Sequence, residues 1–150
     1  MCLKDQKLLN DGYYEGGARD PLCQLQKSRG EDGEEIYRLK VNKQYAHAGE
    51  EVLGAALHYE LGRKFAAEQG LDDKDAKLAG LAMAAKALDV DNGSNEQAAF
   101  KTLLKYAGLP PGIDFYDAIG ACHADSDNDA GSPLVLDKLK EMLQSKRIAW

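Results

Sequence analysis

Apolar residues recur at helical spacing through the C-terminal two thirds of this chain of 150 residues. From Ala46 onward they fall three or four positions apart in five segments, which glycine, proline or helix-capping residues separate. Residues at this spacing lie on one face of an α-helix, so each segment predicts an amphipathic helix. Five helices joined by short links are typical of a compact helical bundle, and we therefore expect a mainly α fold.

The ends of the predicted helices are marked by residues with capping roles. Ser94 and Gln97 form a capping box at the start of the third helix. Ser132 caps the fifth helix, and Pro133 follows at the first helical position, where a missing N–H is tolerated. We expect the five helices over residues 48–69, 72–88, 94–107, 114–122 and 132–147.

The first predicted helix carries the most apolar surface. Every fourth position holds a large apolar residue: Leu53, Leu57, Leu61 and Phe65. Because Val52 and Tyr59 extend this surface around the helix, we expect it to be the central and most buried of the five. Gly49, Gly54 and Gly62 lower its helix propensity, and close approach of a neighbouring helix would compensate for that loss.

The first 46 residues lack helical periodicity and contain five glycines, which predicts turns and irregular structure. Apolar and polar residues alternate over residues 35–41 and indicate a short strand. A lone strand cannot satisfy its backbone hydrogen bonds, so Tyr13 and Tyr14 are candidates for a partner strand. We expect residues 1–46 to be an irregular extension with one or two short β-strands, packed on a helical bundle of residues 47–150 within a single domain.

The net charge of −6 limits the classes of partner. Proteins that wrap nucleic acid neutralise its phosphates with Lys and Arg, but here 25 acidic residues outnumber 19 basic ones. The composition therefore argues against nucleic acid and favours another protein, with a basic surface, as the partner.

The three cysteines, Cys2, Cys23 and Cys122, show neither C-x-x-C spacing nor the even number of a disulfide framework. We interpret them as free thiols in a reducing compartment, and Cys122 as a small core residue that the adjacent His123 does not contact on a regular helix. No stretch approaches the ~20 apolar residues of a membrane helix. The N-terminal residues are charged and lack the apolar region of a secretory signal, so we expect a cytoplasmic location.

The candidate catalytic residues lie at the start of the first predicted helix: His47, Glu50, Glu51 and His58. At about 100° per residue, His47, Glu51 and His58 fall within ~40° of one another on the helix surface. Histidine titrates near neutral pH, so it can form an acid–base pair with a carboxylate. One metal ion would not reach both histidines, since the helix rise separates them by roughly 16 Å. In the alternative interpretation, the carboxylates only stabilise the positive end of the helix.

A second candidate site is an acidic loop after the fourth predicted helix. Asp125, Asp127 and Asp129 have the alternating spacing of a calcium-binding loop, and Asp137 follows. The match to an EF-hand fails because Leu136 occupies the position of the bidentate glutamate. Turns and helix caps favour the same residue types, so we expect no resident cofactor and at most weak calcium binding by these four carboxylates.

Catalytic signatures such as HExxH, GxSxG and GxxxxGK are absent from the sequence. We therefore predict a small acidic interaction or regulatory protein, such as an inhibitor, an immunity-type partner or an adaptor. The alternative is a compact hydrolase or toxin-like catalytic domain that uses the histidines and carboxylates of the first helix. The two hypotheses differ in whether His58 and Glu51 meet His123 or Asp125 in one pocket.

Overall fold

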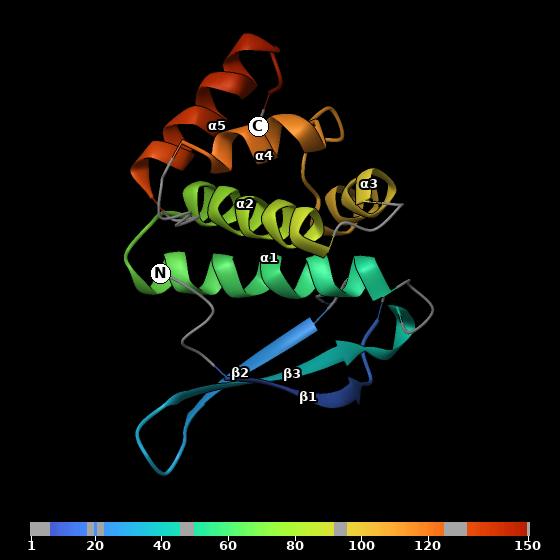
Figure 1. The fold of residues 1–150 in the computed structure, drawn as a ribbon. Coiled ribbons are helices and arrows are strands. Elements are labelled where there is room, and N and C mark those ends of the chain that lie inside the picture. Colours follow the sequence, from blue (N-terminus) through green and yellow to red (C-terminus); the bar gives the residue numbers. More distant parts are fainter. Residues whose placement is uncertain are drawn as a thin grey trace. The chain divides into compact units, whose positions relative to one another are not determined.

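The computed structural model of the protein describes residues 7–17, 20, 23–45, 50–91, 96–124 and 132–149. The chain divides into two compact units: a sheet unit, Cys2–Ala48, and a helical unit, Gly49–Trp150 together with Met1. All described strands belong to the sheet unit and all described α-helices to the helical unit (Figure 1). The predicted mainly α fold with N-terminal strands is confirmed, whereas packing of the N-terminal part on the helices within a single domain stays a prediction.

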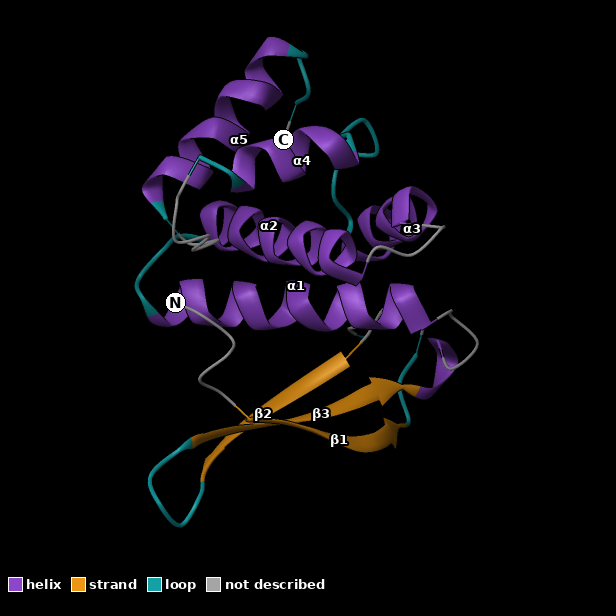
Figure 2. Ribbon diagram, viewed as in Figure 1, coloured by secondary structure: helices purple, strands orange, loops and turns teal. Residues whose placement is uncertain are grey.

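The described strands form one sheet (Figure 2). Its strands are β1 (Lys7–Tyr14), β2 (Cys23–Arg29) and β3 (Glu35–Asn42), and β3 lies in the middle. Strand β1 runs parallel to β3, and β2 runs antiparallel to it. A short 3-10 helix, Lys43–Tyr45, follows β3.

Strand β3 has one buried and one exposed face. Tyr37, Leu39 and Val41 are buried, whereas the intervening Arg38 and Lys40 are exposed. Side chains of a strand point alternately to its two faces, so this burial pattern follows directly from the alternating sequence. The strand predicted here is confirmed and extends one residue further.

The predicted partner strand is also confirmed, because Tyr13 and Tyr14 end β1 beside β3. Strand β2 was not predicted and is a third strand, beyond the one or two that the sequence indicates. It joins β3 through a tight turn, in which the N–H of Gly30 donates to the carbonyl oxygen of Glu34 at 2.9 Å. The N-terminal part is therefore less irregular than its glycine content indicates.

Five α-helices make up the described part of the helical unit (Figure 1). They are α1 (Glu50–Glu68), α2 (Asp73–Asp91), α3 (Glu96–Ala107), α4 (Phe115–Cys122) and α5 (Pro133–Ser145). All five predicted helices are confirmed, with ends that differ by a few residues. Ser132 caps α5 as predicted and accepts a hydrogen bond from the N–H of Leu134, whereas Ser94 lies outside the described residues.

The backbones of α1 and α2 approach closely at two glycines. A Cβ atom added at Gly80 would lie 2.4 Å from the carbonyl oxygen of Tyr59, and one at Gly62 would lie 2.9 Å from the Cα of Gly80. Only glycine fits at such distances, so the predicted role of Gly62 in admitting a neighbouring helix is confirmed. The same prediction for Gly54 is wrong, because a Cβ there would meet nothing within 4 Å. Gly49 lies outside the described residues.

The side of α1 that contacts α2 differs from the predicted one. Its buried residues at a spacing of three or four positions are Ala55, Tyr59, Gly62 and Ala66. A repeat of every fourth residue drifts by about 40° per step around a helix of 3.6 residues per turn. Leu61 and Phe65 are buried, but Leu57 lies nearly opposite the α2 contact and is only half-buried. The repeat of every fourth residue predicts that Leu57 is buried like Leu61 and Phe65, and this prediction is wrong.

Helix α2, rather than α1, is the central helix of this unit. It packs against each of the other four described helices. The spacing of three or four positions along α2 predicts one core-facing side, and all of its residues are buried: Leu78, Leu81, Ala85 and Leu88. Small residues on its other sides are buried too: Ala76, Ala79, Gly80, Ala82 and Ala84. These small side chains let neighbouring helices approach α2 from several sides, which corrects the expectation that the first helix is the most buried.

The remaining helices attach to α2 through a compact apolar layer. The rings of Phe100 in α3 and Phe115 in α4 have their centroids 5.4 Å apart. Leu103 of α3 and Leu139 of α5 are fully buried, as predicted. Burial of a leucine side chain contributes roughly 1.5–3 kcal/mol, so these contacts hold the outer helices in place.

We predict that Gly80→Ala destabilises the helical unit by about 1–3 kcal/mol, because the new methyl group overlaps the Tyr59 carbonyl oxygen. Gly54→Ala serves as the matched control and should stabilise α1 by roughly 0.5–1 kcal/mol, since its surroundings leave room for a methyl group. Denaturant unfolding followed by circular dichroism measures both changes. Equal effects of the two substitutions would contradict the close contact of α1 and α2.

Candidate functional site

The candidate catalytic residues of α1 are only partly within the described structure. His47 and the side chain of Glu50 lie outside it. The Nδ1 of His58 donates a hydrogen bond of 2.8 Å to the carbonyl oxygen of Gly54 in the same helix. The Oε2 of Glu51 is buried and has no hydrogen-bond partner in the part of the chain that the structure describes. The described hydrogen bonds do not join Glu51 to His58, and a catalytic role for this set stays a prediction.

The candidate calcium loop falls outside the described residues, since Asp125, Asp127 and Asp129 are all in an undescribed segment. Asp137, the fourth candidate ligand, is exposed on α5. In the parts of the chain that the structure describes, no three His, Cys, Asp or Glu side chains are grouped to hold a metal ion. Weak calcium binding by the loop stays a prediction.

The thiol of Cys122 is buried in the helical unit, which confirms its predicted place in the core. Its Sγ donates a hydrogen bond of 3.3 Å to the carbonyl oxygen of Ala82. Burial raises the pKa of the thiol from 9.0 to about 11. The thiolate is the reactive form, so Cys122 is protonated and unreactive at neutral pH. His123 follows the end of α4 and is exposed.

Tyr59 places its hydroxyl group in the core. The residue is 2% exposed, and its hydroxyl oxygen has no hydrogen-bond partner among the described residues. Burial raises the pKa of Tyr59 to about 12 and also raises the pKa of the neighbouring Glu60 carboxyl group. The ring of Tyr59 packs over Gly80, so its role is to fill the contact between α1 and α2.

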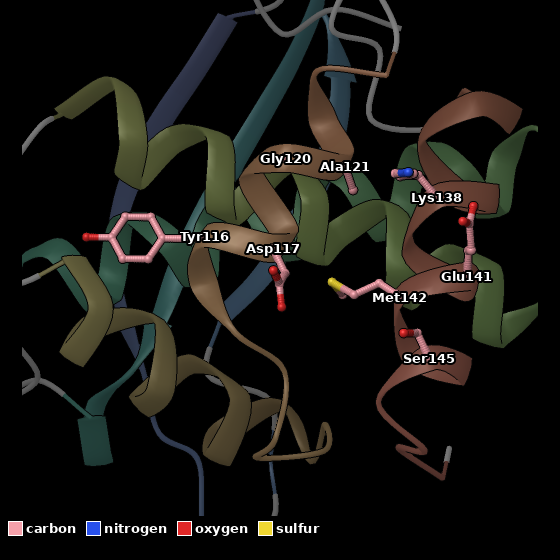
Figure 3. A pocket seen from close by; sticks show the side chains of 8 residues that line it. All are labelled: Tyr116, Asp117, Gly120, Ala121, Lys138, Glu141, Met142 and Ser145. Carbon is pink, nitrogen blue, oxygen red and sulfur yellow. The ribbon is translucent and has the colours of Figure 1, made fainter.

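A pocket of about 360 Å³ lies between α4 and α5 (Figure 3). The residues that line it are Tyr116, Asp117, Gly120, Ala121, Lys138, Glu141, Met142 and Ser145. Figure 3 shows Met142 of α5 extending into the space between the helices, with Asp117 on the opposite side. The ring of Tyr116 extends from the margin, away from the centre of the pocket.

The pocket exists because the α4 side is formed by small residues. Gly120 and Ala121 face the pocket, and a Cβ atom added at Gly120 would meet nothing within 4 Å. The spacing of Met142 along α5 predicts a core position, but its side chain is half-buried and lines the pocket instead. Adjacent small residues in a short apolar helix are the only sequence signal for this site, and they are equally typical of a helix core.

The charged side chains at the pocket are balanced in sign. Lys146 forms an ion pair with Asp117, and this hydrogen bond raises the pKa of the Lys146 ammonium group. Lys138 and Glu141 carry opposite charges one helical turn apart on α5. Exposed ion pairs contribute little to the stability of the fold, so these charged groups are better suited to contact a binding partner.

Comparison of the chain with protein-family profiles, curated proteins and solved structures found no match. Of the helices in the described ranges, none is long and apolar enough to cross a membrane. The function is therefore inferred from the geometry and charge of the described sites.

We predict that Tyr59→Phe stabilises the helical unit by about 1 kcal/mol, because it removes a buried hydroxyl group that has no partner. The variant should also lose less stability at alkaline pH. The pKa of Tyr59 rises from 10.0 to about 12 on folding, so the stability that its protonated form supplies is complete below pH 10 and is lost as the pH rises toward 12.

Denaturant unfolding at neutral and alkaline pH measures both effects of Tyr59→Phe. Tyr116→Phe is the matched control, because that residue is 58% exposed and its hydroxyl group is not in the core. A destabilised Tyr59→Phe variant at neutral pH would show that the Tyr59 hydroxyl group is hydrogen-bonded in solution.

We predict that Cys122 reacts slowly with iodoacetamide in the native protein and rapidly after unfolding, since its thiol is buried and its pKa is raised. Cys2 is expected to react first. Mass spectrometry of proteolytic peptides after timed alkylation measures the order. Modification of Cys122 before the other thiols would contradict its place in the core and make it a candidate nucleophile.

Proposed function

We propose that this protein is a protein-interaction module and that the pocket between α4 and α5 receives an amphipathic helix of its partner. The pocket is the single observation that supports this proposal most directly. Its apolar floor, formed by Gly120, Ala121 and Met142, is bordered by charged side chains. An apolar centre with a polar rim is the usual composition of a protein interface, and an amphipathic helix fits such a groove.

The polar groups of the pocket suit a polypeptide better than a small molecule. Small-molecule sites usually contain several polar groups that converge on the ligand and fix its orientation. Here Asp117 is already paired with Lys146, and both of these side chains are partly exposed. Lys138 and Glu141 line the pocket from α5, where they would meet charged groups of a bound helix.

The distribution of charge supports a partner with basic groups. The sheet unit, Cys2–Ala48, contains eight basic and eight acidic residues. The helical unit contains eleven basic and seventeen acidic residues, so it carries the whole net charge of −6. Such a field accelerates the approach of a basic partner without defining the contact itself.

The alternative of a hydrolase or toxin-like enzyme has less support among the described residues. The lining of the pocket includes neither histidine nor cysteine. Glu51 and His58 of α1 do not line this pocket. The alternative depends on His47 and Glu50, for which the structure describes no side chain.

A displayed library of helical peptides tests the proposed groove. We predict that selection on the wild-type protein yields binders with apolar residues and at least one basic residue on one face. Gly120→Leu should weaken these binders by about tenfold or more, because its side chain fills the open space over α4.

Gly54→Leu is the matched control, because Gly54 is also a helical glycine with open space around an added Cβ atom. It should leave the affinities within about twofold of wild type, a change of less than 0.5 kcal/mol. Circular dichroism checks that both variants fold. Binders that are insensitive to Gly120→Leu, or that respond equally to both substitutions, would refute the groove as the binding site.

A further inference from the structure

The outer side of α5 carries a regular stripe of exposed residues. Its members recur at a spacing of three or four positions: Leu134, Lys138, Glu141 and Ser145. At about 100° per residue they fall within roughly 60° of one another around the helix. The buried residues of α5 lie on the opposite side: Val135, Leu136, Leu139 and Leu143. The stripe therefore faces away from the core and borders the pocket.

The stripe is complementary to itself when two copies of α5 lie antiparallel. If a twofold axis passes midway between Lys138 and Glu141, Lys138 of each copy faces Glu141 of the other. The same register brings Leu134 of each copy beside Ser145 of the other, at the end of the pocket that Met142 lines. Leu134 is 60% exposed in the single chain, so its side chain is available for contact with another molecule.

We infer that the helix that binds beside this pocket is α5 of a second copy of this chain, which makes the contact through its exposed stripe because its apolar face is buried in its own core. The inference rests on the proposed function, in which the pocket is a site for a helix. The helix α5 has the required chemistry, since it presents an apolar residue, Leu134, and a basic residue, Lys138, on one exposed stripe. Twofold dimers are the commonest symmetric assemblies, and their interface is formed by the same patch on both copies.

The net charge of −6 opposes self-association, but the local charges decide the contact. At physiological ionic strength the Debye length is about 8 Å, so distant acidic residues of two copies are largely screened from each other. At the stripe itself, Lys138 and Glu141 balance, and neither forms an ion pair among the described side chains. Lys140 is occupied elsewhere, because its ammonium group lies 2.9 Å from Asp75 of α2.

The dimer is expected to be weak and to depend on protein concentration. One helix stripe with one exposed leucine per copy forms a contact at the small end of protein interfaces. The attraction between Lys138 and Glu141 occurs twice, since the twofold axis repeats it. The two halves of the contact are therefore identical, and a substitution at one position of the chain changes both of them.

Sedimentation equilibrium over micromolar to millimolar protein concentration tests the inference. The wild-type chain should associate to a dimer. Lys138→Glu and Glu141→Lys should each weaken association by about tenfold or more, since each places like charges across the axis twice. The double variant Lys138→Glu/Glu141→Lys should recover association, because it only exchanges the two partners. An equal mixture of the two single variants should form a heterodimer.

The direction of the Glu141→Lys effect separates the local contact from general repulsion. This substitution makes the chain less acidic, so general repulsion predicts stronger association, whereas the stripe predicts weaker association. Lys101→Glu on the exposed side of α3 changes the net charge as Lys138→Glu does and is the matched control. It should affect association less than Lys138→Glu does.

A wild-type chain that remains monomeric at millimolar concentration overturns the inference. A dimer that both single variants leave intact, or that the double variant fails to restore, overturns it as well. These outcomes are distinguishable from failure of the proposed function. Displayed peptides that bind wild type but not Gly120→Leu would keep the groove as a protein-binding site for a different helix.

Discussion

The close contact between α1 and α2 is the constraint on which the rest of the helical unit depends. Gly62 and Gly80 remove the side chains that would separate the two backbones, and Tyr59 packs over the space that remains. Each glycine lowers helix propensity by about 1 kcal/mol, so these positions are favourable only because the helices approach so closely. The unpaired hydroxyl group of Tyr59 is a second cost of the same contact.

The small residues of α2 allow the other helices to pack on it as well. Alanine and glycine residues cover several sides of α2, so this helix contacts each of the four other described helices. Helices α4 and α5 pack on the side of α2 that faces away from α1 (Figure 1). Only the inner faces of α4 and α5 are needed for the core. Their outer faces are thus available for binding, and Gly120 and Ala121 leave a pocket between them.

The sequence predicts the helices and the central strand well, because their signals are local. Ser132 and Pro133 mark the start of α5, and alternation along β3 marks its two faces. Strand β2 was not predicted because its polar residues hide the alternation, although the glycine turn that joins it to β3 is visible in the sequence. A turn of this kind between two alternating segments indicates a hairpin.

Other features depend on tertiary contacts that no local pattern reveals. Gly54 and Gly62 look equivalent in the sequence, yet they lie about 80° apart around α1, and only Gly62 meets α2. Met142 has the spacing of a core residue, but the small residues opposite it place it in a pocket. Four candidate site residues lie outside the described segments, as does the side chain of Glu50, so sequence remains the basis for those hypotheses: His47, Asp125, Asp127 and Asp129.

Hydrogen exchange of the native protein, resolved by residue, tests the central claim most directly. If the contact of α1 with α2 holds the helical unit together, the slowest amides should lie in the middle of these two helices, around Gly62 and Gly80. The free energies of opening of these amides should approach the free energy of global unfolding, while the amides of α4 and α5 exchange faster. Slowest exchange in α4 and α5, with the middle of α1 and α2 opening first, would contradict this account.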